Sequence, residues 1–170
     1  MAVQPPATTT NGELVRRAFA VLNEHEVEPL LGLWGPQTVE RFPDATCVGE
    51  REIADYFRAI FAALPDFHIE ILALAEQGDD VFVHWKLTGT HRGTFAGIAP
   101  TGCAIELDGI DHFVVRDGIV VSNFVVFDQM QFARAVGLMP PDGSPLDRAL
   151  KAAFNAKTKV AQRVRSRRRR

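Results

Sequence analysis

The hydrophobic pattern of this chain changes its period at Pro65-Asp66, and that change constrains the fold more than any other feature. Before it, apolar residues recur at helical spacing, and in the segment 49–64 they form a wide stripe. After it, apolar and polar residues alternate over four long strand candidates, at 67–74, 81–88, 103–115 and 119–127. Helices followed by an antiparallel meander indicate an α+β fold. We expect a cone-shaped, curved antiparallel sheet whose open face is closed by helices around a pocket.

Three helices are expected before the sheet. Thr10, followed three residues later by Glu13, forms a capping box at the start of an amphipathic segment. Pro29 suits the first turn of a second, short helix, and the segment 49–64 is the third. The chain is thus expected to comprise a disordered N-terminus, a cone domain, a C-terminal helical extension and a basic disordered tail, at 1–9, 10–140, 141–160 and 161–170.

Composition is consistent with one domain. The chain has 170 residues, of which 46% are hydrophobic, which is enough for a single core. No apolar run approaches the ~20 residues of a membrane span, and the first residues lack the basic start and apolar stretch of a secretion signal. Cys47 and Cys103 have no metal-ligand spacing around them. This pattern predicts reduced thiols, no metal site and a cytoplasmic location.

Charge is distributed unevenly along the chain. The net charge is -2, but no acidic residue follows Asp147, whereas Arg163–Arg170 contains six arginines. On charge grounds this segment is compatible with nucleic acid or an anionic membrane. It has no interleaved aromatic residues for base stacking. We therefore favour a solvated tail, or one that folds back onto the acidic body, over either of those partners.

A glycine-rich segment, 85–102, joins the second and third long strand candidates. Glycines permit backbone angles that other residues avoid, so this segment can fold tightly over the mouth of a sheet. Trp85 and His91 flank its entrance. The segment joins two strands instead of opening a helix, and it lacks Gly-Lys-Ser/Thr, so a phosphate-binding role is disfavoured.

Five segments together carry a family resemblance. They are Leu64-Pro-Asp-Phe67, the loop 85–102, Gly109-Ile-Asp-His-Phe113, Asp117-Gly-Ile119, and Phe127-Asp128 followed by Gly137-Leu-Met-Pro140. With them the sequence resembles the SnoaL-like polyketide cyclases and ester cyclases of the nuclear-transport-factor-2-like superfamily, over roughly residues 12–140. The resemblance implies a cystatin-like cone of curved sheet with three N-terminal helices, no cofactor, and a homodimer.

The resemblance also implies a reaction. Characterised cyclases of this kind close a ring by intramolecular aldol condensation. Their acid/base residue stands at the end of the last strand, where this chain has Asp128, and a histidine on the preceding strand is similar to His112. The sequence departs from the family pattern at Ala99 and Phe124, where proline and tryptophan are common. These departures leave the acid/base position intact and bear on the identity of the substrate.

Asp128 has two interpretations. It follows a strongly apolar strand, and a carboxylate that faces an apolar cavity loses solvation, which raises its pKa and suits it to acid/base work. Alternatively, Asp128 caps the helix expected from Gln129, a position at which aspartate is preferred. The residues alone favour the cap, whereas the family resemblance favours the catalytic role.

The placement of His112 depends on the hairpin that follows it. A two-residue turn at Asp117-Gly118 places Asp111 on the face that Asp128 occupies. A three-residue turn with Arg116 places His112 there instead, because a slip of one residue exchanges the two faces of a strand. We prefer the three-residue turn narrowly; a half-exposed His112 is the alternative.

The remaining candidate site residues are ring-bearing side chains that would contact substrate. His91, on the loop, could donate to a substrate carbonyl or be an ordinary surface histidine. The aromatic residues expected to line the pocket are Trp34, Tyr56, Trp85 and Phe124.

The function predicted from these observations is cofactor-independent ring closure on a small apolar, carbonyl-bearing ligand. Asp128 would be the general acid/base and His112 would orient or polarise the substrate. Two alternatives stay open: isomerisation or hydration on the same scaffold, and a non-catalytic module for small-molecule binding or dimerisation.

Overall fold

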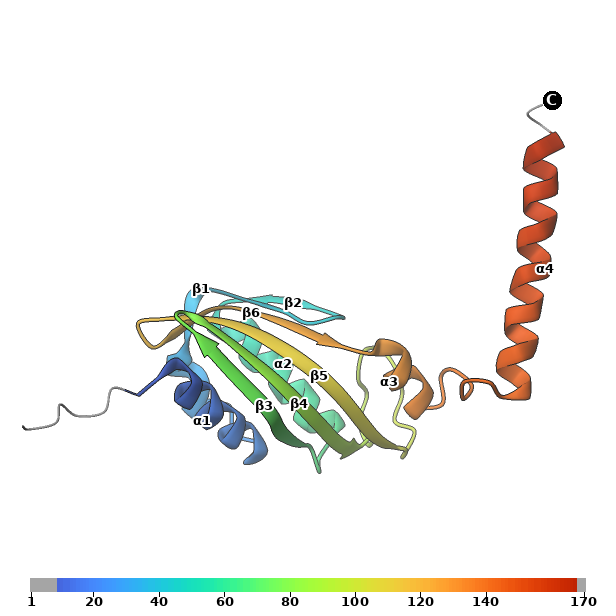
Figure 1. The fold of residues 1–170 in the computed structure, drawn as a ribbon. Helices are drawn as coiled ribbons and strands as arrows, with labels where there is room; N and C mark the ends of the chain where they lie inside the picture. Colours follow the sequence, from blue (N-terminus) through green and yellow to red (C-terminus); the bar gives the residue numbers. More distant parts are fainter. Residues whose placement is uncertain (1–8, 168–170) are drawn as a thin grey trace, which may run out of the picture.

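The computed structural model describes residues 9–167, and the expected α+β class is confirmed. A six-stranded, curved and unclosed sheet is covered on one face by N-terminal helices (Figure 1). The helices before and between the first strands are α1 (Asn11–Asn23), η1 (Glu28–Leu33) and α2 (Gly49–Ala63). The strands are β1 (Trp34–Arg41), β2 (Thr46–Val48), β3 (His68–Gln77), β4 (Asp80–Thr90), β5 (Ala104–Arg116) and β6 (Ile119–Phe127).

Local sequence explains the helix ends. The Thr10 hydroxyl accepts from the backbone N–H of Glu13, and the Glu13 carboxylate accepts from the Thr10 N–H, so the expected capping box is present. Pro29 lies in the first turn of η1, which is a 3-10 helix. Trp34 already begins β1, so Gly35-Pro36 lies inside that strand.

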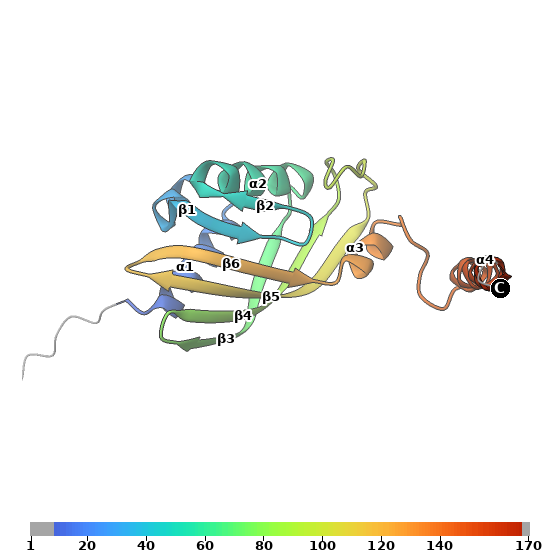
Figure 2. The same ribbon diagram turned by 90° about the horizontal axis from the view of Figure 1, so that it is seen from above.

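The strand order is β2-β1-β6-β5-β4-β3 (Figure 2). Strands β3 to β6 form the expected antiparallel meander. One pair differs from the expectation of a fully antiparallel sheet: β1 pairs with β6 in parallel, with Glu40 opposite Asn123. This pairing joins the N-terminal part of the chain to the last strand and brings their side chains onto one face.

The three-residue turn preferred for the hairpin between β5 and β6 is wrong. Arg116 pairs with Ile119, so the turn has two residues, Asp117 and Gly118, with φ of 52° and 76°. These positive angles are those of a type I′ turn. Beyond the turn, β6 contains one extra residue, Val121, because Val115 pairs with Val120 but Val114 pairs with Ser122. This β-bulge shifts the later residues of β6 to the opposite face.

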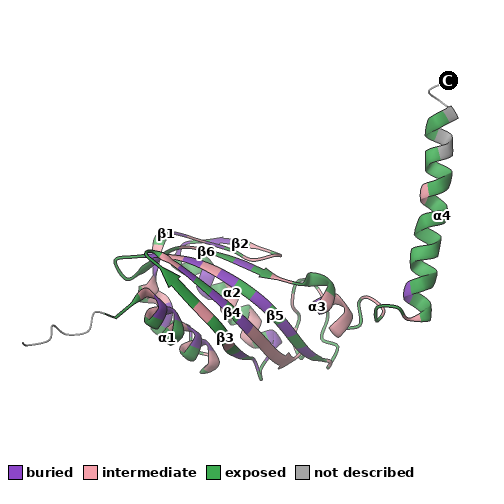
Figure 3. Ribbon diagram, viewed as in Figure 1, coloured by how far each residue is buried: buried purple, intermediate pink, exposed green. Residues whose placement is uncertain are grey.

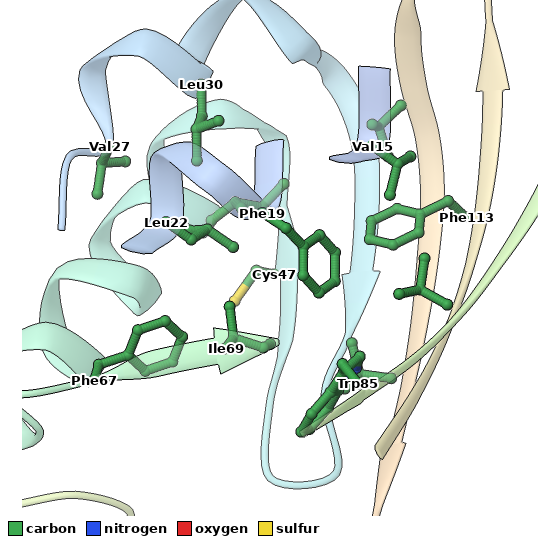
Figure 4. Close-up of a cluster of buried hydrophobic side chains, with 14 of the residues drawn as sticks. Val15, Phe19, Leu22, Val27, Leu30, Cys47, Phe67, Ile69, Trp85 and Phe113 are labelled. Carbon is green, nitrogen blue, oxygen red and sulfur yellow. The ribbon is translucent and has the colours of Figure 1, made fainter. Parts of the chain in front are cut away.

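The core lies between the helices and the concave face of the sheet, where buried residues concentrate (Figure 3). In Figure 4, Phe19 of α1 faces Phe113 of β5, and their ring centroids are 6.2 Å apart in an edge-to-face arrangement. Val15 and Leu22 lie on the same face of α1 as Phe19, at the helical spacing that the sequence shows.

Two helices follow the sheet: α3 (Gln129–Ala135) and α4 (Pro145–Arg167). Helix α4 extends beyond the expected extension 141–160, so residues 161–167, expected to belong to a disordered tail, are helical. Residues 1–8 and 168–170 of the two segments expected to be disordered lie outside the described residues. None of the helices within residues 9–167 has the length and apolar character needed to cross a membrane.

Candidate functional site

An apolar cavity of about 110 Å³ lies between the helices and the concave face of the sheet. Its walls come from α1, η1, α2 and α3, from the loop 91–103, and from the strands β1 and β3 to β6. The lining is almost entirely aliphatic and aromatic, and the titratable side chains in it other than Tyr56 are Glu40 and Asp111. A small number of polar groups in an apolar cavity is typical of a small-molecule site.

Three polar side chains form a row on the cavity wall. Glu40 of β1 pairs with Asn123 of β6, and Asp111 of β5 pairs with Val125, two residues from Asn123. Residues two apart on a strand share a face, so Glu40, Asn123 and Asp111 lie across three adjacent strands and all line the cavity. Their exposed fractions are 2%, 3% and 7%, respectively. We call these three residues the polar row.

Glu40 is held at one oxygen and free at the other. Its Oε1 accepts a hydrogen bond of 2.8 Å from Trp34 Nε1. Its Oε2 is buried and has no hydrogen-bond partner among the described residues. Desolvation, and to a smaller extent the nearby charge of Asp111, raise the pKa of Glu40 to about 8. Glu40 is therefore mainly protonated at neutral pH, with an oxygen available to a ligand.

Asp111 is held at both oxygens. Oδ1 accepts from Trp85 Nε1 at 2.8 Å, and Oδ2 accepts from Asn123 Nδ2 at 3.3 Å. Desolvation raises the pKa of Asp111 to about 7, while these two hydrogen bonds favour the ionised form. Asp111 therefore gives up its proton before Glu40, and near neutral pH the two carboxyl groups together hold roughly one proton.

Asn123 completes the row with an unpaired acceptor. Its Oδ1 is buried and, like Glu40 Oε2, has no partner among the described residues. Buried polar atoms are almost always hydrogen-bonded, and a hydrogen bond between Glu40 and Asn123 contributes to the pKa of Glu40. The two neighbouring oxygens form the polar part of the cavity wall that the polar group of a ligand would meet. Within residues 9–167, no group of three or more His, Cys, Asp or Glu side chains could hold a metal ion.

Three of the predicted aromatic contacts do line the cavity: Trp34, Tyr56 and Trp85. The indole N–H groups of Trp34 and Trp85 hold the two carboxyl groups of the polar row. Tyr56 donates to Asp44 Oδ1 at 2.8 Å, and burial raises the pKa of its hydroxyl above the usual range. Tyr56 also stacks on Phe42, with ring centroids 3.9 Å apart.

Asp128 lies outside the cavity and caps α3. Its Oδ1 accepts from the backbone N–H groups of Met130 and Gln131 at 2.8 and 3.1 Å, and the residue is exposed. The structure therefore places this carboxylate in the capping arrangement, the alternative that the residues alone favoured. Solvent and two backbone donors surround it, which is the opposite of a desolvated base.

His112 and Phe124 lie on the outer face of the sheet, away from the cavity. They are cross-strand partners, because the bulge at Val121 turns Asn123 inward and Phe124 outward. His112 stacks on Phe82 with ring centroids 4.3 Å apart, and its Nε2 lies 2.7 Å from Asp80 Oδ1. Phe124 is 52% exposed. The register that brings Asp111 into the site is the one that takes His112 out of it.

His91 lies buried beneath the glycine-rich loop and is 0% exposed, so it is not a surface histidine. Its Nδ1 lies 3.1 Å from Thr101 Oγ1, and its ring packs edge-to-face against Phe132 of α3. The loop itself is anchored on α2, since the N–H groups of Arg92 and Gly93 both donate to the Ala63 carbonyl. His91 thus supports the loop that covers the cavity and is absent from the cavity lining.

The sequence interpretation missed Glu40 and Asn123 and did not select Asp111. A signal for Asp111 exists: every second residue of β5 from Ile105 to Val115 is apolar or glycine except Asp111. A single carboxyl group in the buried register of a strand indicates a functional position. Glu40 has no comparable signal, because Val39 and Arg41 beside it give β1 no clear alternation.

Comparison with known proteins agrees with this architecture. The family model described as SnoaL-like polyketide cyclase matches residues 12–136. AclR from Streptomyces galilaeus has 22% identity and a TM-score of 0.68, with 88% of this chain and 94% of that chain covered. A SnoaL-like protein from Jannaschia sp. CCS1 has 20% identity and a TM-score of 0.70, with 81% and 100% covered. A search of curated proteins finds no match.

A third solved structure is named for a ketosteroid isomerase-like fold. A protein from Catenulispora acidiphila with a ketosteroid isomerase-like fold, in complex with trimethylamine, has 17% identity and a TM-score of 0.66, with 80% and 100% covered. Fold and site together define an α+β cone with an acidic pair in an apolar cavity. The chain belongs to the SnoaL-like polyketide cyclase family.

Proposed function

We propose that the protein catalyses cofactor-independent enolisation and ring closure of an apolar, carbonyl-bearing substrate, with the polar row as its catalytic centre. The observation that carries this proposal is the pair of carboxyl groups, Glu40 and Asp111, buried in an apolar cavity with pKa values raised to about 8 and about 7. Two groups that titrate near neutral pH can exchange a proton with a substrate at little cost. Membership of a family described as polyketide cyclases supports the choice of substrate class.

The hydrogen bonds of the pair suggest a role for each group. Asp111, ionised first and stabilised by Trp85 and Asn123, is the base. It takes a proton from the carbon beside a substrate carbonyl, so the C–H bond breaks and Asp111 becomes protonated. Glu40, protonated and free at Oε2, donates its proton to the carbonyl oxygen as the enol forms.

Ring closure then follows from the same two groups. The enol carbon attacks a second carbonyl of the substrate, and a C–C bond forms. The proton on Asp111 passes to the new alkoxide oxygen, and the enol O–H returns its proton to Glu40. Both carboxyl groups are thereby restored, and no cofactor enters the balance. The apolar walls exclude water, which would otherwise protonate the enol.

The test is deuterium exchange beside the carbonyl of a simple apolar ketone. We expect the protein to accelerate exchange at the acidic methylene of 2-tetralone in deuterated buffer, followed by proton NMR. Asp111→Asn should lower the protein-dependent rate tenfold or more, because general-base catalysis contributes about 100- to 10,000-fold with good substrates and less with a minimal probe. The protein-dependent rate should rise with pH through about 7, as Asp111 ionises, and fall above about 8, as Glu40 loses its proton.

Asp128→Asn provides the matched control. It makes the same chemical change at the exposed cap of α3, where asparagine also caps a helix, and it should leave the rate unchanged. Loss of exchange in Asp128→Asn with normal exchange in Asp111→Asn would return the catalytic role to Asp128. Exchange no faster than in buffer with the wild-type protein would contradict the proposed chemistry.

A further inference from the structure

Helix α4 carries an uncovered apolar side. Its large apolar residues recur at helical spacing and so share one side of the helix: Leu146, Leu150, Phe154 and Val160. Their exposed fractions are 62%, 48%, 67% and 60%. We call these four residues the apolar side of α4. Figures 1 and 2 show the helix standing away from the sheet and from the other helices, so this side is open to a partner.

The opposite side of α4 is basic. Its exposed residues recur every three or four positions, and most of them are cationic: Arg148, Lys151, Asn155 and Lys159. From residue 148 to residue 170 the chain contains 10 Lys or Arg and no Asp or Glu. Leucine and phenylalanine on one side of a helix, with lysine and arginine on the other, are typical of a helix that lies in the surface of a bilayer.

Most of these positive charges are not neutralised within the protein. Lys151 Nζ lies 2.7 Å from Asp147 Oδ2 and 3.0 Å from Asp142 Oδ1. The other basic residues of α4 whose side chains are described have no carboxylate partner among the described residues: Arg148, Lys157, Lys159 and Arg165. Their charge is therefore available to an anionic surface, which attracts basic residues on amphipathic helices.

The contacts at the start of α4 leave the rest of the helix clear of the body. The Asp147 carboxylate accepts from the Gly143 N–H at 3.0 Å. Asp142 accepts from Lys151 and from Arg134 of α3, at 3.0 and 3.3 Å. These contacts join the first turns of α4 to α3, and the helix then points away from the sheet (Figure 1). Its length, about 35 Å for 23 residues, is accessible to a flat surface.

We propose that α4 binds the surface of an anionic lipid bilayer, with its apolar side at the acyl boundary and its basic side among the headgroup phosphates. On charge alone a solvated tail was favoured for this end of the chain, and the added observation is a helix with an exposed apolar side. A nucleic acid would match the charges but leave the apolar side in water, whereas a bilayer matches both. The proposal does not rest on the proposed reaction.

The helix would lie along the bilayer and not across it, because it lacks the apolar length of a spanning helix. Lys157, three residues after Phe154, falls on the apolar side of α4. A lysine stem can lie along an apolar surface while its ammonium group reaches the lipid phosphates, so this residue is compatible with the same orientation.

Co-sedimentation of the full chain with vesicles tests the proposal. We expect binding to be roughly tenfold or more tighter with vesicles of phosphatidylcholine and phosphatidylglycerol than with phosphatidylcholine alone. High salt should weaken it, because the attraction between the basic residues and the lipid phosphates becomes screened. Equal binding to the two kinds of vesicle, or no binding to either, would overturn the proposal.

A matched pair of variants separates insertion of the apolar side from attraction by charge. Phe154→Glu should abolish sedimentation with the anionic vesicles, because it places a carboxylate on the side that enters the acyl boundary. Asn155→Glu adds the same charge one residue away, on the basic side, and should retain most of the binding. Equal losses in the two variants would mean that charge alone attracts the chain, which overturns the proposal.

A fluorescent label reports which side of α4 enters the bilayer while every residue of the apolar side stays in place. In a Cys103→Ser background, which removes the more accessible native thiol, either Ala153→Cys or Asn155→Cys is labelled with nitrobenzoxadiazole. Ala153 lies three residues after Leu150, on the same side of the helix, and Asn155 lies on the basic side. Anionic vesicles should shift the emission to the blue at position 153 and much less at position 155. Equal shifts, or none, would contradict the proposed orientation.

The same materials identify the other possible partners of α4. If duplex DNA binds the chain and anionic vesicles do not, α4 is a nucleic-acid-binding helix and the proposal is wrong. If the label at Ala153→Cys already emits in the blue without vesicles and does not respond to them, a protein surface covers α4, and the proposal is likewise overturned.

Discussion

The free energy of unfolding should fall by several kcal/mol between about pH 5 and about pH 8. Glu40 and Asp111 have folded-state pKa values of about 8 and about 7, against ordinary values of 4.5 and 3.8. A carboxyl group whose pKa is raised by folding binds a proton more tightly in the folded state. Its stabilising contribution is complete below the unfolded pKa and is lost as pH rises through the folded pKa. Each pKa unit corresponds to about 1.4 kcal/mol.

Other shifted carboxyl groups act outside this range. Asp66, Asp142 and Asp147 have pKa values lowered by hydrogen bonds, so their contributions disappear only as pH falls below about 4. Urea denaturation across the range from about pH 5 to about pH 9 measures the slope. Asp111→Asn should flatten it, because one of the two groups no longer titrates. A wild-type stability that is constant between about pH 5 and about pH 8 would show that the pair is not desolvated.

Gly109→Ala should destabilise the protein by about 2 to 5 kcal/mol. A Cβ at position 109 would lie 2.2 Å from Trp85 Cζ2 and 2.3 Å from Cη2, so the indole ring rests directly on the backbone of β5. Trp85 is 4% exposed and donates to Asp111. Displacing the ring would combine overpacking, which costs about 1 to 3 kcal/mol, with loss of a buried hydrogen bond, which costs a similar amount.

Gly32→Ala is the matched control for that change. A Cβ at Gly32 meets no atom within 4 Å, and the glycine has no positive φ, so this variant should unfold close to the wild-type midpoint. The measurement is denaturant unfolding of both variants together with tryptophan fluorescence, which should shift in Gly109→Ala because Trp85 moves. Equal stability of Gly109→Ala and wild type would mean that the ring is not held against β5.

Much of the fold could be predicted from the sequence because its signals are local. The alternation over 119–127 predicted β6 with its observed bounds, and the apolar stripe over 49–64 predicted α2 to within one residue. The capping box located the start of α1. The parallel pairing of β1 with β6 has no local signal, since it joins segments more than 80 residues apart.

The site was harder to predict because the face of each strand depends on a single residue. The turn type could be argued from Asp117-Gly118, but the extra residue at Val121 lies among apolar neighbours that show no break in pattern. Without it, Phe124 would face the cavity and Asn123 would face solvent. Family resemblance directed attention to Asp128, whose position at a strand end satisfies the motif while its side chain caps a helix.

The bulge at Val121 also has a consequence for how related sequences should be read. Relatives that lack this inserted residue would present the opposite set of β6 side chains to the cavity, even where the flanking sequences are identical. An alignment without a gap at position 121 would then equate an inward residue with an outward one throughout the second half of the strand. The bulge must therefore be located before the role of a polar residue such as Asn123 is assigned to the aligned residue of another family member.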